Sequence, residues 1–89
     1  MDNQHRKITG YRGLDKTEID LMNEVKALGI QMEGVLKKVE AHVNEQYQED
    51  SNYERMTNAT PHRFLNIAKT DFQTGLMAAT RAVAQPELF

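Results

Sequence analysis

Three cations and one aromatic ring lie close together near the start of this chain. Arg6, Lys7 and Arg12 surround Tyr11, which sits between two glycines, and Asp2 is the sole acid of this stretch. A ring beside cations suits a nucleobase and its phosphate, since base stacking contributes about 1–3 kcal/mol per base and a charge-assisted hydrogen bond about 1.5–3 kcal/mol. Taken alone, however, such a cluster is more often a solvated basic tail.

Catalytic patterns are missing from the sequence. The three histidines His5, His42 and His62 lie far apart, and none has a histidine or carboxylate partner at the i,i+4 spacing of a zinc site. Asp71 lies between threonines with no base nearby and fits a hydrogen bond or ion pair between helices. No phosphate-binding glycine loop, nucleophile elbow or paired-carboxylate motif is present. We therefore expect no enzyme activity, no metal and no cofactor.

Composition narrows the class of protein further. The 89 residues suffice for one small domain, residues 1–89, and the formal net charge is −2. This charge argues against binding of DNA or RNA polymers, so an anion site must be local and built by a few converging cations. There is no cysteine, no apolar run near the roughly 18 residues of a membrane span, and no signal-peptide core. We expect a soluble cytoplasmic protein that does not bind membranes.

The apolar spacing predicts one long helix after a short lead, residues 1–13. Asp15 and Glu18 have the spacing of a capping box, and the helix is predicted over residues of about 15–48. One apolar stripe follows this helix by steps of three and four residues: Leu21, Val25, Leu28, Met32, Val35, Val39, Val43 and Tyr47.

A second helix is predicted over residues of about 60–85. Thr60 is the expected cap, Pro61 suits the first helical turn because its missing amide is no loss there, and Gln85-Pro86 ends the helix. Residues 48–59 show no apolar period and are predicted to form the connection. The stripe of the second helix consists of Phe64, Leu65, Ala68, Phe72, Leu76, Ala79 and Val83.

Two long helices joined by one connection predict an all-α, antiparallel helical hairpin. A hairpin covers only one stripe per helix, yet the second helix also carries Gly75, Ala78, Ala79 and Ala82, which let another backbone approach closely. Small, elongated domains bury little apolar surface, and no disulfide or metal is available to compensate. We therefore expect a homo-oligomer.

The segment from Arg63 through Pro86 to Phe89, RFLNIAKTDFQTGLMAATRAVAQPELF, resembles the last helix of phage-encoded anti-CBASS proteins that bind cyclic oligonucleotides. Two further stretches resemble the same family, Tyr11-Arg12-Gly13-Leu14 and Asn23 to Gly29, NEVKALG. Residues 44–62 show no motif that can be aligned. In the last helix Phe72 replaces the usual leucine.

This resemblance implies roles for individual residues. Tyr11 would stack on a base of a cyclic dinucleotide, Lys26 would contact a phosphate, and Arg12 would add a weaker contact or pair with an acid such as Asp15. Arg63 would belong to a separate site for cyclic trinucleotides, where its place in the first helical turn would let it join backbone amides at an anion. The residues themselves also permit a surface ion pair for Lys26, with a glutamate such as Glu33, and a plain surface arginine at position 63.

The resemblance also implies an assembly and a function. The family forms homohexamers of hairpins that sequester cyclic dinucleotides such as cGAMP, and cyclic trinucleotides, without degrading them. In this way they block CBASS effectors in the cytoplasm of the infected bacterial host. The principal alternative is a non-enzymatic helical module that oligomerises and binds another protein. A phosphodiesterase is a distant third. The preferred cyclic nucleotide does not follow from the sequence.

Overall fold

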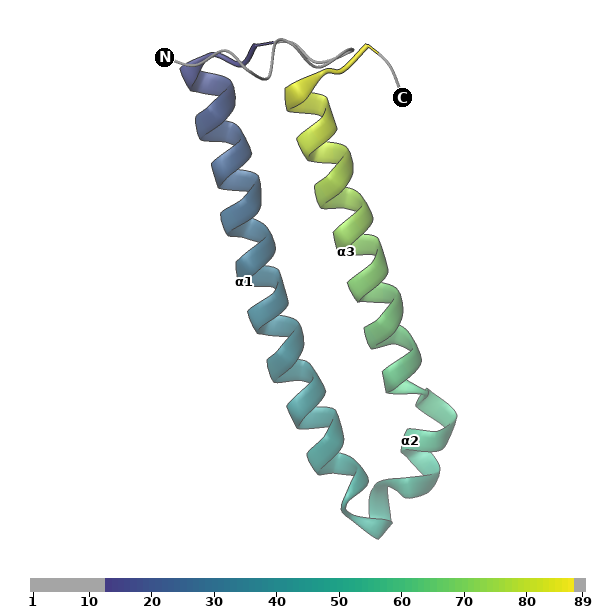
Figure 1. Cartoon of the computed structure of the whole chain (residues 1–89). Helices are drawn as coiled ribbons and strands as arrows, with labels where there is room; N and C mark the ends of the chain where they lie inside the picture. Colours follow the sequence, from purple (N-terminus) through teal and green to yellow (C-terminus); the bar gives the residue numbers. More distant parts are fainter. Residues whose placement is uncertain (1–12, 88–89) are drawn as a thin grey trace.

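The computed structural model describes residues 13–87, which form an all-α hairpin without any β-strand. The long helices α1 (Lys16–Tyr47) and α3 (Pro61–Ala84) run antiparallel, side by side, in a rod of 60 × 23 × 16 Å (Figure 1). The predicted fold class is confirmed, and both long helices lie within one residue of their predicted ends. Within the described range, no helix has the length and apolar character needed to cross a membrane.

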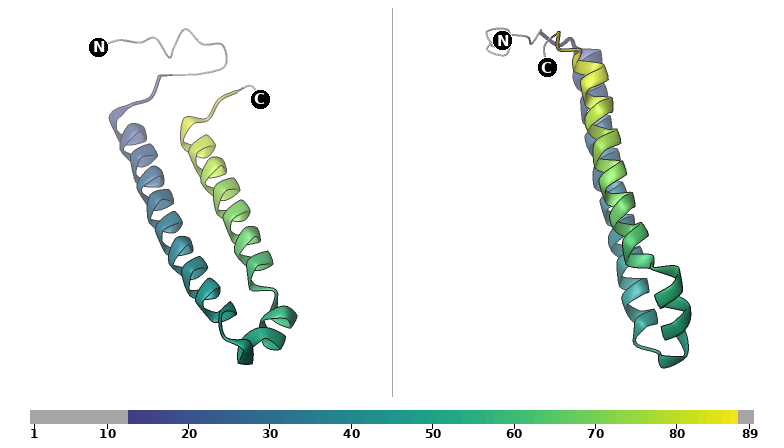
Figure 2. Two further views of the ribbon diagram at one scale, coloured as in Figure 1. Left: turned by 60° about the horizontal axis from the view of Figure 1, so that its bottom comes forward. Right: turned by 90° about the vertical axis from the view of Figure 1, so that its right-hand side faces the viewer.

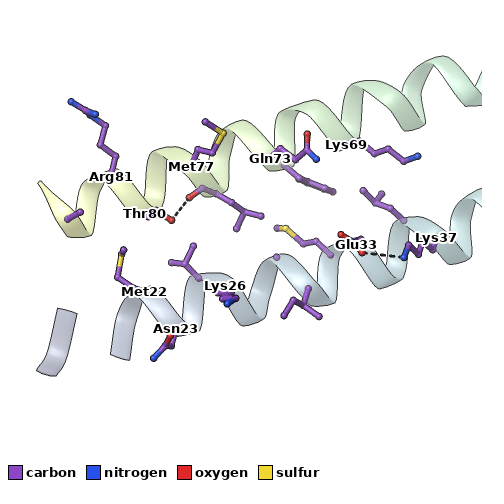
Figure 3. A pocket seen from close by; sticks show the side chains of 18 of the residues that line it. Met22, Asn23, Lys26, Glu33, Lys37, Lys69, Gln73, Met77, Thr80 and Arg81 are labelled. Atoms are coloured by element: carbon purple, nitrogen blue, oxygen red, sulfur yellow. Dashed lines mark hydrogen bonds and ion pairs between the residues drawn. The ribbon is translucent and has the colours of Figure 1, made fainter. Parts of the chain in front are cut away.

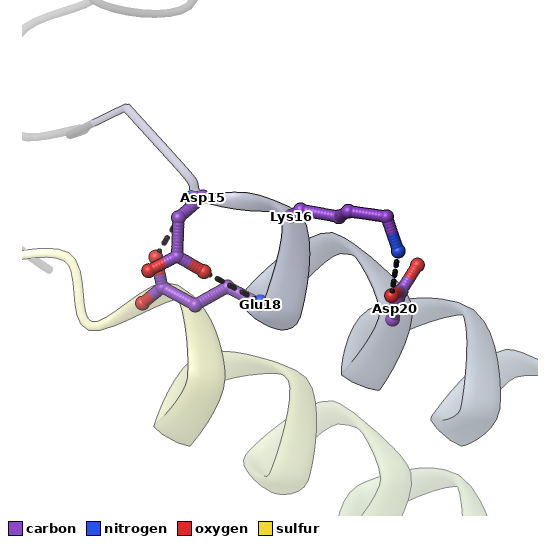
Figure 4. A network of polar contacts seen from close by, with 4 residues as sticks. All are labelled: Asp15, Lys16, Glu18 and Asp20. Atoms are coloured by element: carbon purple, nitrogen blue, oxygen red, sulfur yellow. Dashed lines mark hydrogen bonds and ion pairs between the residues drawn. The ribbon is translucent and has the colours of Figure 1, made fainter.

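The predicted capping box fixes the start of α1. The backbone amide of Glu18 donates to Asp15 Oδ1 at 2.8 Å, and the Asp15 amide donates to Glu18 Oε1 at 3.0 Å (Figure 4). An exposed ion pair between Lys16 and Asp20 follows on the first turns, with 2.8 Å between Nζ and Oδ2. Because two of the free amides of the helix end have partners, α1 begins at a defined residue.

The connection between the long helices is more ordered than predicted. Residues 48–59 contain a short 3₁₀ turn, η2 (Asp50–Asn52), and a helix, α2 (Tyr53–Ala59), which together close one end of the hairpin (Figure 2). The Asn52 side-chain amide donates to the Gln46 carbonyl at 3.1 Å and so ties the turn to the last turn of α1. Residues 48–59 form the connection as predicted, but the sequence does not predict α2 within it, because two turns of helix are too short to show an apolar period.

The buried core lies at this closed end. Three apolar side chains among the described residues are buried: Met56 of α2 is 2% exposed, Leu65 of α3 5%, and Val43 of α1 6%. Beside them, the rings of Tyr47 and His62 stack with centroids 5.4 Å apart and an angle of 6° between their planes. The short helix α2 thus contributes the most buried side chain of the hairpin.

The junction between α2 and α3 differs from the prediction at Thr60. Its side chain caps no amide; instead its backbone is left-handed, with φ 48° and ψ 57°, and turns the chain from α2 into α3. Pro61 occupies the first turn as predicted. At the far end Gln85 is also left-handed, with φ 50°, and its amide bonds the Arg81 carbonyl at 2.7 Å, so α3 stops before Pro86.

The face of α1 that meets α3 is rotated from the predicted stripe. Four predicted members, Leu21, Leu28, Val35 and Val39, are 43–52% exposed. The covered side of α1 carries the other four predicted members, Val25, Met32, Val43 and Tyr47, together with Met22, Gly29, Leu36 and Glu40. Both sets are apolar enough to face a partner, and the sequence pattern of one helix does not say which side its neighbour covers. In α3, Leu65, Ala68, Leu76 and Val83 are covered as predicted, whereas Phe64, Phe72 and Ala79 are exposed.

Truncation of Met56 tests the importance of the closed end. We expect Met56→Ala to lower the free energy of unfolding by about 2–5 kcal/mol, because it removes a fully buried side chain and leaves a cavity. Tyr53→Ala, on the same helix, removes a side chain that is 66% exposed and should change stability far less. Chemical denaturation followed by circular dichroism measures both variants, and equal losses would contradict the burial pattern.

Two glycines within α1 offer a matched pair for measuring how closely α3 approaches. A Cβ at Gly29 would lie 3.0 Å from Leu76 Cδ1, whereas a Cβ at Gly34 would have no atom within 4 Å. Alanine favours a helix interior over glycine by about 1 kcal/mol, so Gly34→Ala should stabilise the hairpin by nearly that amount. Gly29→Ala should gain less, since Leu76 must shift. Thermal unfolding ranks the two variants, and a loss of stability in Gly34→Ala would mean that the backbone there is not open.

Candidate anion-binding groove

A groove of about 1120 Å³ runs between α1 and α3, from the middle of the hairpin toward the end where the chain enters α1. Its lining combines apolar and charged side chains from both helices (Figure 3). The apolar part includes Met22, Ile30, Leu36, Phe72, Leu76 and Met77. The volume is slightly above the usual range of about 300–1,000 Å³ for a small-ligand site, and the groove is open to solvent, since Ile30 and Met77 in its lining are 67% and 72% exposed.

The groove is locally cationic although the chain is acidic. Four cationic side chains and two carboxylates line it, namely Lys26, Lys37, Lys69, Arg81, Glu33 and Glu40, while the whole chain has a formal charge of −2. Four cations against two carboxylates give these lining residues a formal charge of +2, opposite in sign to that of the whole chain. The acidic composition predicts that any anion site is built by a few cations that lie close together, and the groove has such an arrangement.

Two of these cations are held by carboxylates of the groove itself. Lys37 Nζ lies 3.3 Å from Glu33 Oε1 on the same helix, and Lys69 Nζ of α3 lies 3.2 Å from Glu40 Oε2 of α1. The second pair is half-exposed and joins the two long helices. Both pairs lie in or near solvent and contribute little to stability, typically about 0–1 kcal/mol each. Their effect on the groove is to fix the positions of two ammonium groups.

Lys26 differs from these lysines. It lies on α1, ten residues after Lys16, exposed at the groove, and it forms no ion pair with any residue between 13 and 87. The alternative of a surface pair with Glu33 is wrong for this structure, since Glu33 binds Lys37. An ammonium group without a carboxylate partner keeps its charge available to an anionic ligand. The position of Lys26 is thus compatible with the predicted phosphate contact, which stays a prediction.

Tyr11 and Arg12 lie outside the described residues, so their predicted roles stay predictions. The cations Arg6 and Lys7 belong to the same undescribed stretch. The described chain enters α1 through Gly13 and Leu14, both partly covered. Lys26 lies ten residues beyond the first residue of α1, or about 15 Å along the helix axis at 1.5 Å per residue.

Arg63 lies in the first turn of α3, at the closed end of the hairpin, and so does not join Lys26 within one chain. Its guanidinium carbon lies 5.5 Å from the centre of the Phe64 ring, and it forms no ion pair within the described part of the chain. The backbone amide of Arg63 itself donates to the Thr60 carbonyl at 3.1 Å. Pro61 has no amide to offer.

Sequence reasoning missed most of the groove. Lys69 and Glu40 each interrupt an otherwise apolar stripe of their helix. Opposite charges at such positions of two predicted antiparallel helices indicate an ion pair between the helices, and this signal can be found from sequence. Arg81 and Met77 give no such signal, since both lie on exposed parts of α3. No group of three or more metal-ligating side chains occurs within residues 13–87.

Comparison with known proteins places the fold in one class, the helical hairpin domains. The family described as Acb2/Tad1, hairpin domain, matches residues 3–84, and the chain belongs to this family. The anti-CBASS protein 2 of Pseudomonas phage JBD67 is 42% identical over an alignment of 106 positions, gaps included, which covers 98% of this chain and 98% of the relative.

Proposed function

We propose that this protein sequesters cyclic oligonucleotide second messengers without degrading them and so blocks the activation of CBASS effectors. The observation that carries the proposal is the 42% identity, over nearly the full length of both chains, with a phage protein named for its anti-CBASS role. The locally cationic groove on an acidic chain supports it. The protein would act in the cytoplasm of the infected bacterial host.

Capture would combine base stacking with neutralisation of phosphate charge. A cyclic dinucleotide such as cGAMP has two bases and two phosphates, and Lys26 offers an ammonium group that no described carboxylate neutralises. Tyr11 would stack on a base, with about 1–3 kcal/mol per base, and Arg12 would strengthen the phosphate contact. Two protein copies around one ligand would double these contributions. No covalent step is needed, so one bound messenger remains intact.

Self-association forms part of the proposal. Leu21, Leu28, Val35 and Val39 on α1 are 43–52% exposed within one hairpin, and the three buried side chains among residues 13–87 are a small core for a rod 60 Å long. A homo-oligomer, and a hexamer in particular, would cover these side chains and bring sites of several chains together. Arg63, at the closed end, would then contribute to a separate site for cyclic trinucleotides.

A rival function has support from one observation. The same exposed side chains also suit a helical module that oligomerises and binds another protein, with Lys26 a plain surface lysine. Such a module would deplete no cyclic nucleotide from solution. Binding and recovery measurements therefore separate the two functions.

Removal of the proposed contacts should abolish capture without disturbing the fold. We expect Lys26→Ala and, separately, Tyr11→Ala to lower cyclic dinucleotide affinity at least about 10-fold, the effect of losing one charge-assisted bond or one stacked base. Isothermal titration calorimetry measures the affinity, and size-exclusion chromatography with light scattering should show an unchanged assembly.

A matched control is available on the same helix. Lys38→Ala removes the same charge from an exposed lysine of α1 that does not line the groove, and its affinity should equal that of the unaltered protein. Arg63→Ala should weaken cyclic trinucleotide binding alone. Equal affinities of the Lys26→Ala and Lys38→Ala variants would refute the phosphate role of Lys26.

The fate of the ligand distinguishes capture from degradation. The protein is mixed with a cyclic dinucleotide, free ligand is measured by chromatography, and the protein is then digested with protease. We expect free ligand to fall on mixing and to return intact, in full, after digestion. A linear product would identify a phosphodiesterase, and no fall on mixing would favour the protein-binding module.

A further inference from the structure

Asn23 is a polar residue of α1 to which the hairpin itself gives no structural role. It lies inside the helix, past the first turn, and is exposed. Its side-chain amide forms no hydrogen bond with any residue between 13 and 87. Asparagine is among the less favourable residues of a helix interior, because its side chain competes for backbone groups. Asn23 therefore lowers the stability of α1 without a compensating contact in the described chain.

The position of Asn23 is next to Lys26. Both residues line the groove, and Figure 3 shows them beside each other on α1, whereas Met22 points toward α3. Residues three apart are neighbours on a helix surface, with about 5–6 Å between their Cβ atoms. A phosphate bound by Lys26 would therefore have an uncharged amide close by, in the direction of the start of α1.

A side-chain amide is chemically suited to the edge of a nucleobase. Its carbonyl oxygen accepts hydrogen bonds and its NH₂ group donates two, all in one plane. Adenine presents a donor beside an acceptor, and an asparagine amide complements this pattern with two parallel hydrogen bonds. Guanine presents two acceptors, O6 and N7, on one edge and its N2–H₂ donor on another. Because an amide has both functions, it can bond to either base.

We propose that Asn23 binds the edge of a nucleobase in the cyclic dinucleotide whose phosphate Lys26 contacts. This inference rests on the proposed function, to which it adds a polar contact to the base besides the stacking on Tyr11. Tyr11 precedes α1 in the chain, and Asn23 lies between Lys26 and the start of that helix, about 4.5 Å from Lys26 along the axis at 1.5 Å per residue. An uncharged amide at this place holds a base without repelling the phosphate.

Replacement of the amide by a carboxylate tests the contact to the base. Asn23→Asp keeps the shape of the side chain, but a carboxylate only accepts hydrogen bonds. We expect weaker binding of both cyclic di-AMP and cyclic di-GMP, because the new charge repels phosphate. The two losses should differ, so that the ratio of the two affinities changes at least about fivefold. Isothermal titration calorimetry measures both affinities, and an unchanged ratio would overturn the inference.

The direction of the change identifies the edge of the base. Guanine has adjacent N1–H and N2–H₂ donors, which a carboxylate can accept together, so a shift toward cyclic di-GMP would place that edge at residue 23. The edge with O6 and N7 repels a carboxylate, whereas adenine keeps one bond through its N6–H₂ group. A shift toward cyclic di-AMP would place this second edge there. Either shift supports a contact between Asn23 and a base.

Asn44→Asp is the matched control. It makes the same change of charge at another exposed asparagine of α1, one that does not line the groove. Both affinities and their ratio should therefore equal those of the unaltered protein. If Asn44→Asp changed the ratio as much as Asn23→Asp does, the shift would reflect the charge of the chain alone, and the inference would fail.

Asn23→Ala separates a contact to the base from support of Lys26 or of the assembly. We expect at least about fivefold lower affinity with an unchanged dependence on salt concentration, because the ionic contact to the phosphate remains. Lys26→Ala should weaken that salt dependence, since it removes a charge that salt screens. Size-exclusion chromatography with light scattering should show an unchanged assembly. A weakened salt dependence or a smaller assembly of Asn23→Ala would contradict the proposed contact.

The inference and the proposed function fail in different ways. If the unaltered protein binds neither cyclic di-AMP nor cyclic di-GMP nor cGAMP, the proposed function is refuted, and the role of Asn23 with it. If binding depends on Lys26 and is the same in Asn23→Ala as in the unaltered protein, the role of Asn23 alone is refuted.

Discussion

The constraint that governs this molecule is how little surface two helices side by side can bury. Each helix presents one face to the other, and the resulting core among the described residues consists of Val43, Met56 and Leu65. Hydrophobic stabilisation scales with the apolar area removed from water. With only a few buried groups, the free energy gained from burial exceeds the entropic cost of ordering the chain by little. The short helix α2 matters because it adds a third element at one end, and with it the most buried side chain.

The same constraint produces the groove. Where no third element among residues 13–87 covers the hairpin, α1 and α3 leave a concave surface lined by apolar and charged side chains. Two lysines there are positioned by the carboxylates Glu33 and Glu40, while Lys26 has no such partner between residues 13 and 87. A small acidic protein thereby presents positive charge at one place. Sparse packing, a liability for stability, is what leaves room for a ligand or for a neighbouring chain.

The lining of the groove has the chemical character that the proposed ligand requires. Cyclic oligonucleotides combine flat apolar bases with a ring of phosphates, and the groove combines apolar side chains with ammonium groups. Membership of the Acb2/Tad1 hairpin-domain family rests on residues 3–84. The proposed capture also needs Tyr11 and Arg12, which precede the described residues. The groove therefore accounts for one part of the proposed site, the phosphate contact on α1.

Much of the hairpin was determined by local sequence alone. The capping box of Asp15 and Glu18, Pro61 in the first turn of α3 and the stop before Pro86 act through neighbouring backbone groups, so their spacing suffices to predict them. The tertiary structure decided which side of α1 meets α3, because Leu21 and Met22 are equally apolar and only the position of the second helix covers one of them. It also decided that α2 folds and that Lys69 reaches Glu40, 29 positions earlier in the chain. Contacts between distant segments depend on the packing of all the elements at once, which local spacing does not contain.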